Sequence, residues 1–143
     1  MSEDRGARST VIRVEDLRRD YRMGGEDVHA LRGVSFDVDA GEYVAVVGPS
    51  GCGKSTLLNL LGVVDAPSGG RVLLAGRDVS ALGDREATAF RLRHVGFVFQ
   101  RFYLLPTLTA AENVELPMAE AGVAKGDRRA RAAELLAYVG LGP

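Results

Sequence analysis

Residues 48–56 read Gly48-Pro49-Ser50-Gly51-Cys52-Gly53-Lys54-Ser55-Thr56, and this run matches the phosphate-loop pattern G-x-x-x-x-G-K-[ST]. Its glycines allow backbone N–H groups to converge on a phosphate, in conformations that a side chain would forbid. Lys54 is placed to reach the β- and γ-phosphates, the Ser55 hydroxyl is the expected protein ligand of Mg²⁺, and Thr56 is expected near the α-phosphate. The run therefore predicts a nucleotide-binding site.

The sequence on either side of this loop predicts a strand before it and a helix after it. Residues 43–47 are uninterrupted and apolar, which is typical of a strand covered on both faces inside a parallel sheet. Residues 57–64 predict an apolar helix. Because strand, loop and helix follow in the required order, we interpret residues 48–56 as a phosphate-binding loop and not as a glycine-rich turn. We interpret Cys52 as filler at a tolerant position and not as a nucleophile, although alkylation there would block the nucleotide.

The sequence ahead of the loop predicts antiparallel β structure. Residues 11–14 form a β-branched run, which is followed by a charged, poorly periodic connection around Tyr21 and by a turn cluster at residues 24–27. Apolar and polar residues then alternate over residues 34–39, as in a half-buried strand. Residues 1–10 are polar and charged and predict a disordered tail ahead of the domain.

Downstream of the loop, the sequence predicts another apolar strand and another helix. The strand covers residues 95–99 and is followed at once by Gln100. Residues 126–140 predict a helix, because apolar residues recur at helical spacing and a glycine follows at the end. His29 and His94 lie far apart and have no Cys, Asp or Glu at metal-ligand spacing, so no zinc site is expected and both are interpreted as structural.

Composition and charge narrow the function further. With 46% hydrophobic and 26% charged residues, the 143-residue chain is an ordinary globular sequence of at most one domain. Its formal net charge of -1 supplies no positive field to gather DNA or RNA, so no nucleic-acid partner is expected. No stretch approaches the roughly 20 apolar residues of a membrane span. The single cysteine and the absence of a signal peptide point to the cytoplasm.

Several further stretches carry a family resemblance: residues 28–36 and 40–43 before the loop, and residues 68–72, 75–79, 93–100, 104–109 and 112–114 after it. They resemble the ATPase domain of ATP-binding cassette (ABC) proteins, in particular the cassettes of lipoprotein-release and macrolide-export systems. The resemblance covers nearly everything from Val11 to Pro143. It implies an α/β fold with a P-loop NTPase core and an N-terminal antiparallel β subdomain, incomplete at the C-terminus.

The resemblance also implies roles for two residues outside the loop. Tyr21 matches the aromatic residue that stacks on the adenine ring of ATP in this family, although a core tyrosine on an edge strand is the alternative. Gln100 matches the Q-loop glutamine, whose amide oxygen can ligate Mg²⁺ or orient the attacking water, and its alternative is a solvated loop residue. The implied site thus binds ATP and Mg²⁺, with Lys54 and Gln100 as catalytic residues and Ser55 and Gln100 at the metal.

The partners implied by the resemblance are of two kinds. The apolar loop from Phe102 to Leu108 matches the region that contacts transmembrane permease subunits in the family. The alternative is that its side chains pack into the local core. ATP hydrolysis in the family takes place between two head-to-tail ATP-binding domains, so a second such domain is the other expected partner. The implied location is cytoplasmic and peripheral, at the inner face of the cell membrane.

One departure from the family pattern concerns hydrolysis. The signature loop, the Walker B aspartate, the catalytic glutamate and the switch histidine come later in the family, and no apolar strand ending in Asp-Glu occurs in this sequence. We therefore expect residues 11–143 to form a partial ABC domain that binds nucleotide without hydrolysing it alone. Unpaired sheet edges predict poor solubility. The alternatives are a guanylate-type nucleotide kinase, whose loop would lie almost at the N-terminus, and a truncated cassette without catalysis.

Overall fold

The computed structural model of this chain describes residues 9–142, which form two compact units divided between Ala89 and Phe90. Residues 1–8 of the predicted tail lie outside the described residues, and the first strand begins at Thr10. Helix α2 (Asp84–His94) runs across the division between the units. Every helix within residues 9–142 is too short or too polar to cross a lipid bilayer.

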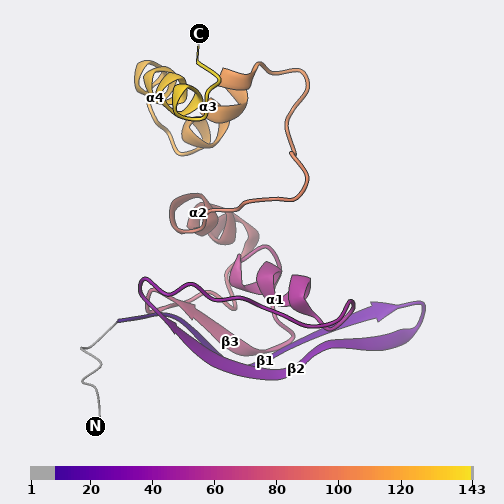
Figure 1. Cartoon of the computed structure of the whole chain (residues 1–143). Helices are drawn as coiled ribbons and strands as arrows, with labels where there is room; N and C mark the ends of the chain where they lie inside the picture. Colours follow the sequence, from indigo (N-terminus) through magenta and orange to yellow (C-terminus); the bar gives the residue numbers. More distant parts are fainter. Residues whose placement is uncertain (1–8, 143) are drawn as a thin grey trace. The chain divides into compact units, whose positions relative to one another are not determined.

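The first unit is an antiparallel sheet with one helix against it (Figure 1). Its strands are β1 (Thr10–Met23), β2 (Glu26–Asp39), β3 (Gly69–Leu74) and β4 (Arg77–Asp78). They pair in the order β2-β1-β3-β4, and every pairing is antiparallel. This arrangement confirms the predicted antiparallel β subdomain, in which β1 and β2 form one long hairpin.

The charged residues around Tyr21 belong to β1, so the prediction of a connection there was wrong. Each of residues 18–22 has a partner in β2, with Tyr21 opposite Val28. The backbone ladder of an antiparallel pair does not depend on apolar side chains. Charged side chains can remain on its surface, as Arg18 does in its ion pair with Asp16. A lack of hydrophobic alternation therefore concealed a continuous strand.

The core of the first unit lies between the sheet and helix α1 (Lys54–Leu61). Its buried apolar side chains are Val14, Leu17, Leu31, Val38, Leu57, Leu60, Val63, Val72, Leu74 and Val79. The helix begins and ends three residues earlier than predicted, with Gly62 as its C-cap. Leu57 and Leu60 are three residues apart and therefore lie on one face of α1. Their burial holds the helix on the sheet, and with it the loop at the helix N-terminus.

Two segments predicted as buried strands are not strands in the structure. Residues 43–47 are irregular, with Tyr43 98% exposed and Val47 85% exposed. Residues 95–99 are irregular as well, and Val98 is fully exposed. A parallel strand is held by neighbours on both sides, and within residues 9–142 neither segment is part of a sheet. The α/β P-loop fold is therefore incomplete here: its antiparallel subdomain is formed, whereas its parallel sheet is not.

The second unit contains a pair of helices, α3 (Ala110–Glu120) and α4 (Lys125–Tyr138), that contact each other. Helix α4 confirms the helix predicted over residues 126–140. Arg128 of α4 donates a hydrogen bond to Glu115 of α3 at 3.0 Å, and Ala132 of α4 is fully buried. Helices α2 and α3 were not among the predicted elements.

Candidate functional site

The phosphate loop enters α1 without a side chain to cap the helix. Gly53 precedes the helix in the left-handed region, at φ 91°, and no side-chain hydrogen bond is made at the helix N-terminus. The first N–H groups of a helix have no partner within it, and together with the helix dipole they attract an anion. Helix α3 differs, because Thr109 and Glu112 form a complete capping box at its N-terminus. The N-terminus of α1 is thus open to a phosphate.

Strand β2 determines where the loop lies on the sheet. A Cβ atom on Gly53 would lie 2.6 Å from the carbonyl oxygen of Ala30, so the two backbones approach more closely than any other residue would allow. The pairing of the hairpin is irregular at the same point, because the β2 partners of Arg19 and Asp20 skip Ala30. Such a bulge leaves one residue unpaired and redirects it. Here the unpaired residue is the one that contacts the phosphate loop.

The side chain of Lys54 folds back across the loop. Its Nζ atom donates hydrogen bonds to the carbonyl oxygens of Gly48 at 2.8 Å and Pro49 at 2.7 Å. The same atom lies 3.7 Å from the Sγ atom of Cys52. The ammonium group is therefore held over the loop by neutral acceptors, and anionic phosphate oxygens would be stronger partners for it.

The remaining loop residues are accessible, as a binding role requires. Gly48, Pro49, Ser50, Gly51 and Cys52 are exposed, and Gly53 and Lys54 are half-buried. In the first turn of α1, Ser55 is exposed and Thr56 is half-buried. Mg²⁺ keeps most of its waters and takes few protein ligands, so a single exposed hydroxyl beside the loop suits this ion. Within residues 9–142 there is no group of three or more His, Cys, Asp or Glu residues that could hold a metal.

Gln100 and the two histidines lie outside this loop. Gln100 is exposed and belongs to the second unit, whereas the phosphate loop belongs to the first, so its role at the metal and the attacking water stays a prediction. His29 lies 2.7 Å from Asp20 across the hairpin, measured from Nδ1 to Oδ1. The His94 ring packs on Phe90, with ring centroids 4.6 Å apart. These contacts agree with structural roles for both histidines.

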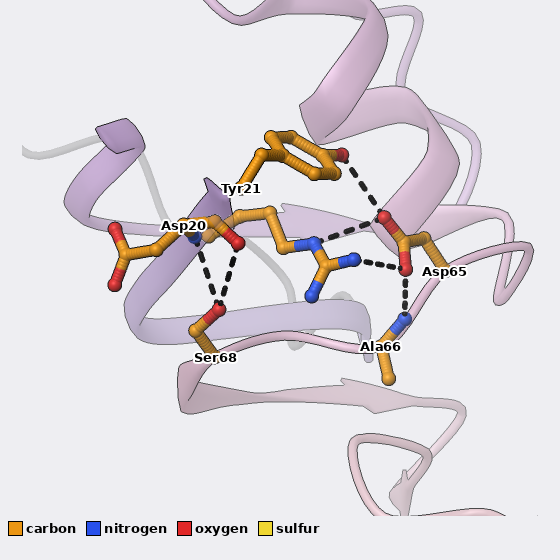
Figure 2. A network of polar contacts seen from close by, with 6 residues as sticks. Asp20, Tyr21, Asp65, Ala66 and Ser68 are labelled. Carbon is orange, nitrogen blue, oxygen red and sulfur yellow. Dashed lines mark hydrogen bonds and ion pairs between the residues drawn. The ribbon is translucent and has the colours of Figure 1, made fainter. Parts of the chain in front are cut away.

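Tyr21 takes part in a network of polar contacts that joins β1 to the segment after α1 (Figure 2). Its hydroxyl donates a hydrogen bond to Asp65 Oδ2 at 2.9 Å. Arg19 donates two more to the same carboxylate, from Nε at 3.0 Å and from a terminal nitrogen at 2.8 Å. The backbone N–H of Ala66 donates a fourth at 2.8 Å. Asp65 therefore receives hydrogen bonds on both oxygens, and the Tyr21 ring is tied down at its hydroxyl end.

Arg19 also covers one face of the Tyr21 ring. Its guanidinium carbon lies 4.5 Å from the ring centroid, within the range of a cation–π contact. Burial lowers the pKa of Arg19, but hydrogen bonding and charge from Tyr21 and Asp65 outweigh this effect and raise the pKa above its usual value. The side chain is therefore a permanent cation, and one face of the ring is occupied by it.

Arg19 and Asp65 were not predicted as site residues from the sequence. A signal for Arg19 was present, because residues two apart on a strand share a face and Tyr21 follows at that spacing. Asp65 had no comparable signal, since it lies 44 residues from Tyr21 in the sequence and only the folded chain brings them together.

The hairpin connects Tyr21 with the phosphate loop inside the first unit. Tyr21 pairs with Val28, and Ala30 follows two residues further along β2. Two residues of strand span about 7 Å. Since Ala30 contacts Gly53, one short length of β2 separates the loop from the position opposite Tyr21. Tyr21 and the phosphate loop therefore lie against neighbouring positions of β2 within the first unit.

The apolar loop of the second unit is exposed. Phe102 is 89% exposed, and Tyr103, Leu104 and Leu105 are exposed as well. Asn113 of α3 holds the following turn in place, because its amide bonds both the N–H and the carbonyl oxygen of Leu105. The backbone of the loop is therefore held at Leu105, while its apolar side chains contact solvent.

Comparisons with known proteins identify the family to which this chain is similar. The family model described as ABC transporter matches residues 31–143. A protein of Thermotoga maritima, named an uncharacterized ABC transporter ATP-binding protein, is 55% identical over 132 residues, which are 92% of this chain and 56% of that protein. The macrolide export ATP-binding/permease protein MacB 1 of Yersinia pestis bv. Antiqua is 48% identical over 134 residues, which are 94% of this chain and 21% of that protein.

A solved structure extends the comparison. The dimeric post-hydrolysis structure of the ATP-binding cassette MJ0796 bound to ADP and Pi is 41% identical, with a TM-score of 0.80 over 87% of this chain and 55% of that chain. This chain thus spans little more than half the length of the Thermotoga protein and of the cassette. It spans a smaller share, 21%, of the macrolide exporter.

Proposed function

This chain belongs to the ABC transporter family, and we propose that it binds ATP with Mg²⁺ as the nucleotide-binding part of a transporter ATPase. In this proposal residues 48–56 hold the phosphates, Lys54 contacts the β- and γ-phosphates, and Tyr21 stacks on the adenine ring. Mg²⁺, when bound, neutralises phosphate charge, and Ser55 and Gln100 are the residues proposed to hold it. Lys54 and Gln100 are the proposed catalytic residues.

One observation carries this proposal, namely the uncapped N-terminus of α1 beside the side chain of Lys54. The helix begins directly after a left-handed glycine and has no side-chain cap. The ammonium group of Lys54 rests on the carbonyl oxygens of Gly48 and Pro49 at the same place. Helix N–H groups and a cation that converge on one exposed loop form a binding site for a polyphosphate.

The proposed partners are transmembrane permease subunits, or a fused permease domain, and a second ATP-binding domain. The exposed apolar loop from Phe102 to Leu108 is the proposed contact with the permease. Two relatives support this: the name of the macrolide exporter includes a permease, and the MJ0796 cassette is dimeric. The proposed location is cytoplasmic and peripheral, at the inner face of the cell membrane.

We also propose that a polypeptide of these 143 residues binds ATP without turning it over. No apolar strand ending in Asp-Glu occurs in the sequence, and a water-activating carboxylate at such a strand end is what the ABC resemblance implies for hydrolysis. The test is release of phosphate from Mg-ATP by the purified polypeptide. Sustained hydrolysis that depends on Lys54 would refute the proposal.

The test of the binding function is a calorimetric titration of the protein with Mg-ATP. Saturable binding at one site per chain is expected, and its absence would overturn the proposal. The nucleotide-kinase alternative conflicts with the family assignment, and an assay of phosphate transfer from ATP to GMP checks it directly. Transfer to GMP would contradict the transporter ATPase function, because this reaction belongs to a different class of enzyme.

A further inference from the structure

Asp65 lies at the centre of a network of hydrogen bonds that includes no residue of the phosphate loop. Its two carboxylate oxygens accept hydrogen bonds from the Arg19 guanidinium, the Tyr21 hydroxyl and the Ala66 N–H. We propose that Asp65 and Arg19 are positioning residues, which hold the Tyr21 ring in the orientation in which it stacks on a nucleotide base. This inference rests on the proposed function of ATP binding.

The geometry fixes the ring in two ways. The hydrogen bond to Asp65 holds the hydroxyl end of Tyr21, and the guanidinium of Arg19 lies against one face of the ring at 4.5 Å from its centroid. A base can therefore stack only on the opposite face. A ring that is already oriented loses little freedom when the base arrives, so part of the ordering cost of binding is removed in advance.

The ion pair between Arg19 and Asp65 is less exposed than the ion pairs within the sheet. Arg19 and Asp65 are only 23% and 27% exposed at their side chains, whereas Arg13 and Asp37 are 49% and 50% exposed. Two nearly parallel hydrogen bonds from a guanidinium to a carboxylate give a planar, directional contact. Partial burial also reduces the screening of this pair by solvent and salt. The pair is therefore suited to holding a neighbouring side chain still.

Asp65 also links the two parts of the site. It follows α1, and its backbone N–H donates to the carbonyl oxygen of Asn59 within that helix. The N-terminus of the same helix carries Lys54 and the phosphate loop. A movement of α1 would therefore be transmitted to Tyr21 through Asp65, which couples the phosphate end of the site to the base end.

A purely structural ion pair is the competing explanation, and the choice of ligand separates the two. Inorganic tripolyphosphate contacts the phosphate loop but offers no base to Tyr21. Asp65→Asn keeps the shape of the side chain and removes its charge. We expect this variant to bind Mg-ATP about three- to tenfold more weakly and to bind tripolyphosphate with unchanged affinity, because one charge-dependent contact is weakened.

Further variants make the test independent of any one substitution. Tyr21→Phe removes the hydroxyl and Arg19→Lys removes the planar guanidinium, and each is expected to weaken ATP binding without weakening tripolyphosphate binding. These two variants provide the test if Asp65→Asn does not fold. In a Tyr21→Ala background, Asp65→Asn should cause no further loss, since the residues act as one unit. Asp37→Asn breaks the exposed ion pair with Arg13 on the same hairpin and serves as the matched control, with no change expected.

The possible results distinguish this inference from the proposed function. If the folded Asp65→Asn, Tyr21→Phe and Arg19→Lys variants bind ATP as the unchanged protein does, or lose ATP and tripolyphosphate equally, the positioning role is overturned while ATP binding stands. If the unchanged protein binds tripolyphosphate but shows no preference for ATP, Tyr21 does not contact a base and the inference fails. If it binds neither ligand, the proposed function fails first.

Discussion

The backbone of Gly53 lies against the carbonyl oxygen of Ala30, and a Cβ atom at position 53 would come within 2.6 Å of that oxygen. Gly53 also has a φ of 91°, which side chains rarely tolerate. We expect Gly53→Ala to reduce the free energy of unfolding by about 2–4 kcal/mol, since backbone strain and a close contact add together. Denaturant unfolding with and without Mg-ATP measures this loss and the accompanying loss of binding.

Gly51→Ala is the matched control for that substitution. Gly51 has a similar φ of 81°, but a Cβ atom there would meet nothing within 4 Å. The free energy of unfolding of this variant should therefore fall by only about 1–2 kcal/mol, from backbone strain alone. Equal losses in the two variants would show that the contact with Ala30 contributes nothing.

Lys54→Ala should weaken the binding of Mg-ATP by about 10- to 100-fold, because hydrogen bonds between charged groups are lost at the phosphates. The lysine now bonds neutral carbonyl oxygens of exposed residues, so the stability of the fold should change little. Calorimetric titration provides the affinities. Lys125→Ala, at the start of α4, replaces the other lysine of the chain and should leave the affinity unchanged. Unaltered ATP binding by Lys54→Ala would contradict the assignment of the site.

Modification of Cys52 with N-ethylmaleimide should abolish the binding of Mg-ATP. Cys52 is exposed, and its Sγ atom lies 3.7 Å from the Lys54 ammonium, so an attached maleimide would occupy the space above the phosphate loop. Bound ATP should slow the reaction, which mass spectrometry can follow. Cys52→Ala should bind ATP normally and resist the reagent. A fully modified protein that still binds ATP would place the nucleotide elsewhere.

The stability of α3 should depend on pH through Glu112. Two hydrogen bonds lower the pKa of Glu112 below its usual value. The larger effect comes from the Thr109 N–H, and the smaller one comes from the Thr109 hydroxyl. A lowered pKa in the folded state means that the carboxylate stabilises the helix fully above the unfolded value of about 4.3. This contribution is lost as the pH falls through the lowered folded pKa. Circular dichroism of unfolding between neutral and acidic pH measures it.

Glu112→Gln should remove that part of the pH dependence, because an amide cannot ionise. Glu120→Gln, at the other end of α3, is the control and should behave like the unchanged protein over this range. Identical pH profiles for all three proteins would mean that the capping box does not stabilise the helix measurably.

Features that depend on local sequence could be predicted well. The phosphate loop, the turn at Gly24 and Gly25, and the helix over residues 125–138 each follow from side chains and glycines within a few positions of one another. The antiparallel hairpin was predicted in part, because alternation marks β2 near Val34 but is absent from β1 near Tyr21. The start of α3 is marked in the sequence by the capping box of Thr109 and Glu112, three residues apart.

Features that depend on distant residues could not be predicted. Burial of residues 43–47 and 95–99 requires strands beside them, and composition alone does not show whether these neighbours are present. The contact between Arg19 and Asp65 joins residues 46 positions apart, and no periodic pattern connects them. Gln100 and the phosphate loop belong to different units, so the role of Gln100 at the site stays a prediction.

The unpaired residue at Ala30 has a consequence for ligand choice. Its backbone touches Gly53, and Val28, two residues away on β2, pairs with Tyr21. In the proposed site, this part of β2 therefore separates the phosphate end from the base end. Removing Ala30 would leave Arg19 opposite Leu31 and Asp20 opposite His29 in a regular ladder, and would remove the backbone that contacts Gly53. In the proposed site, the interval between phosphate and base is therefore set by the backbone of β2 and not by a side chain of the loop.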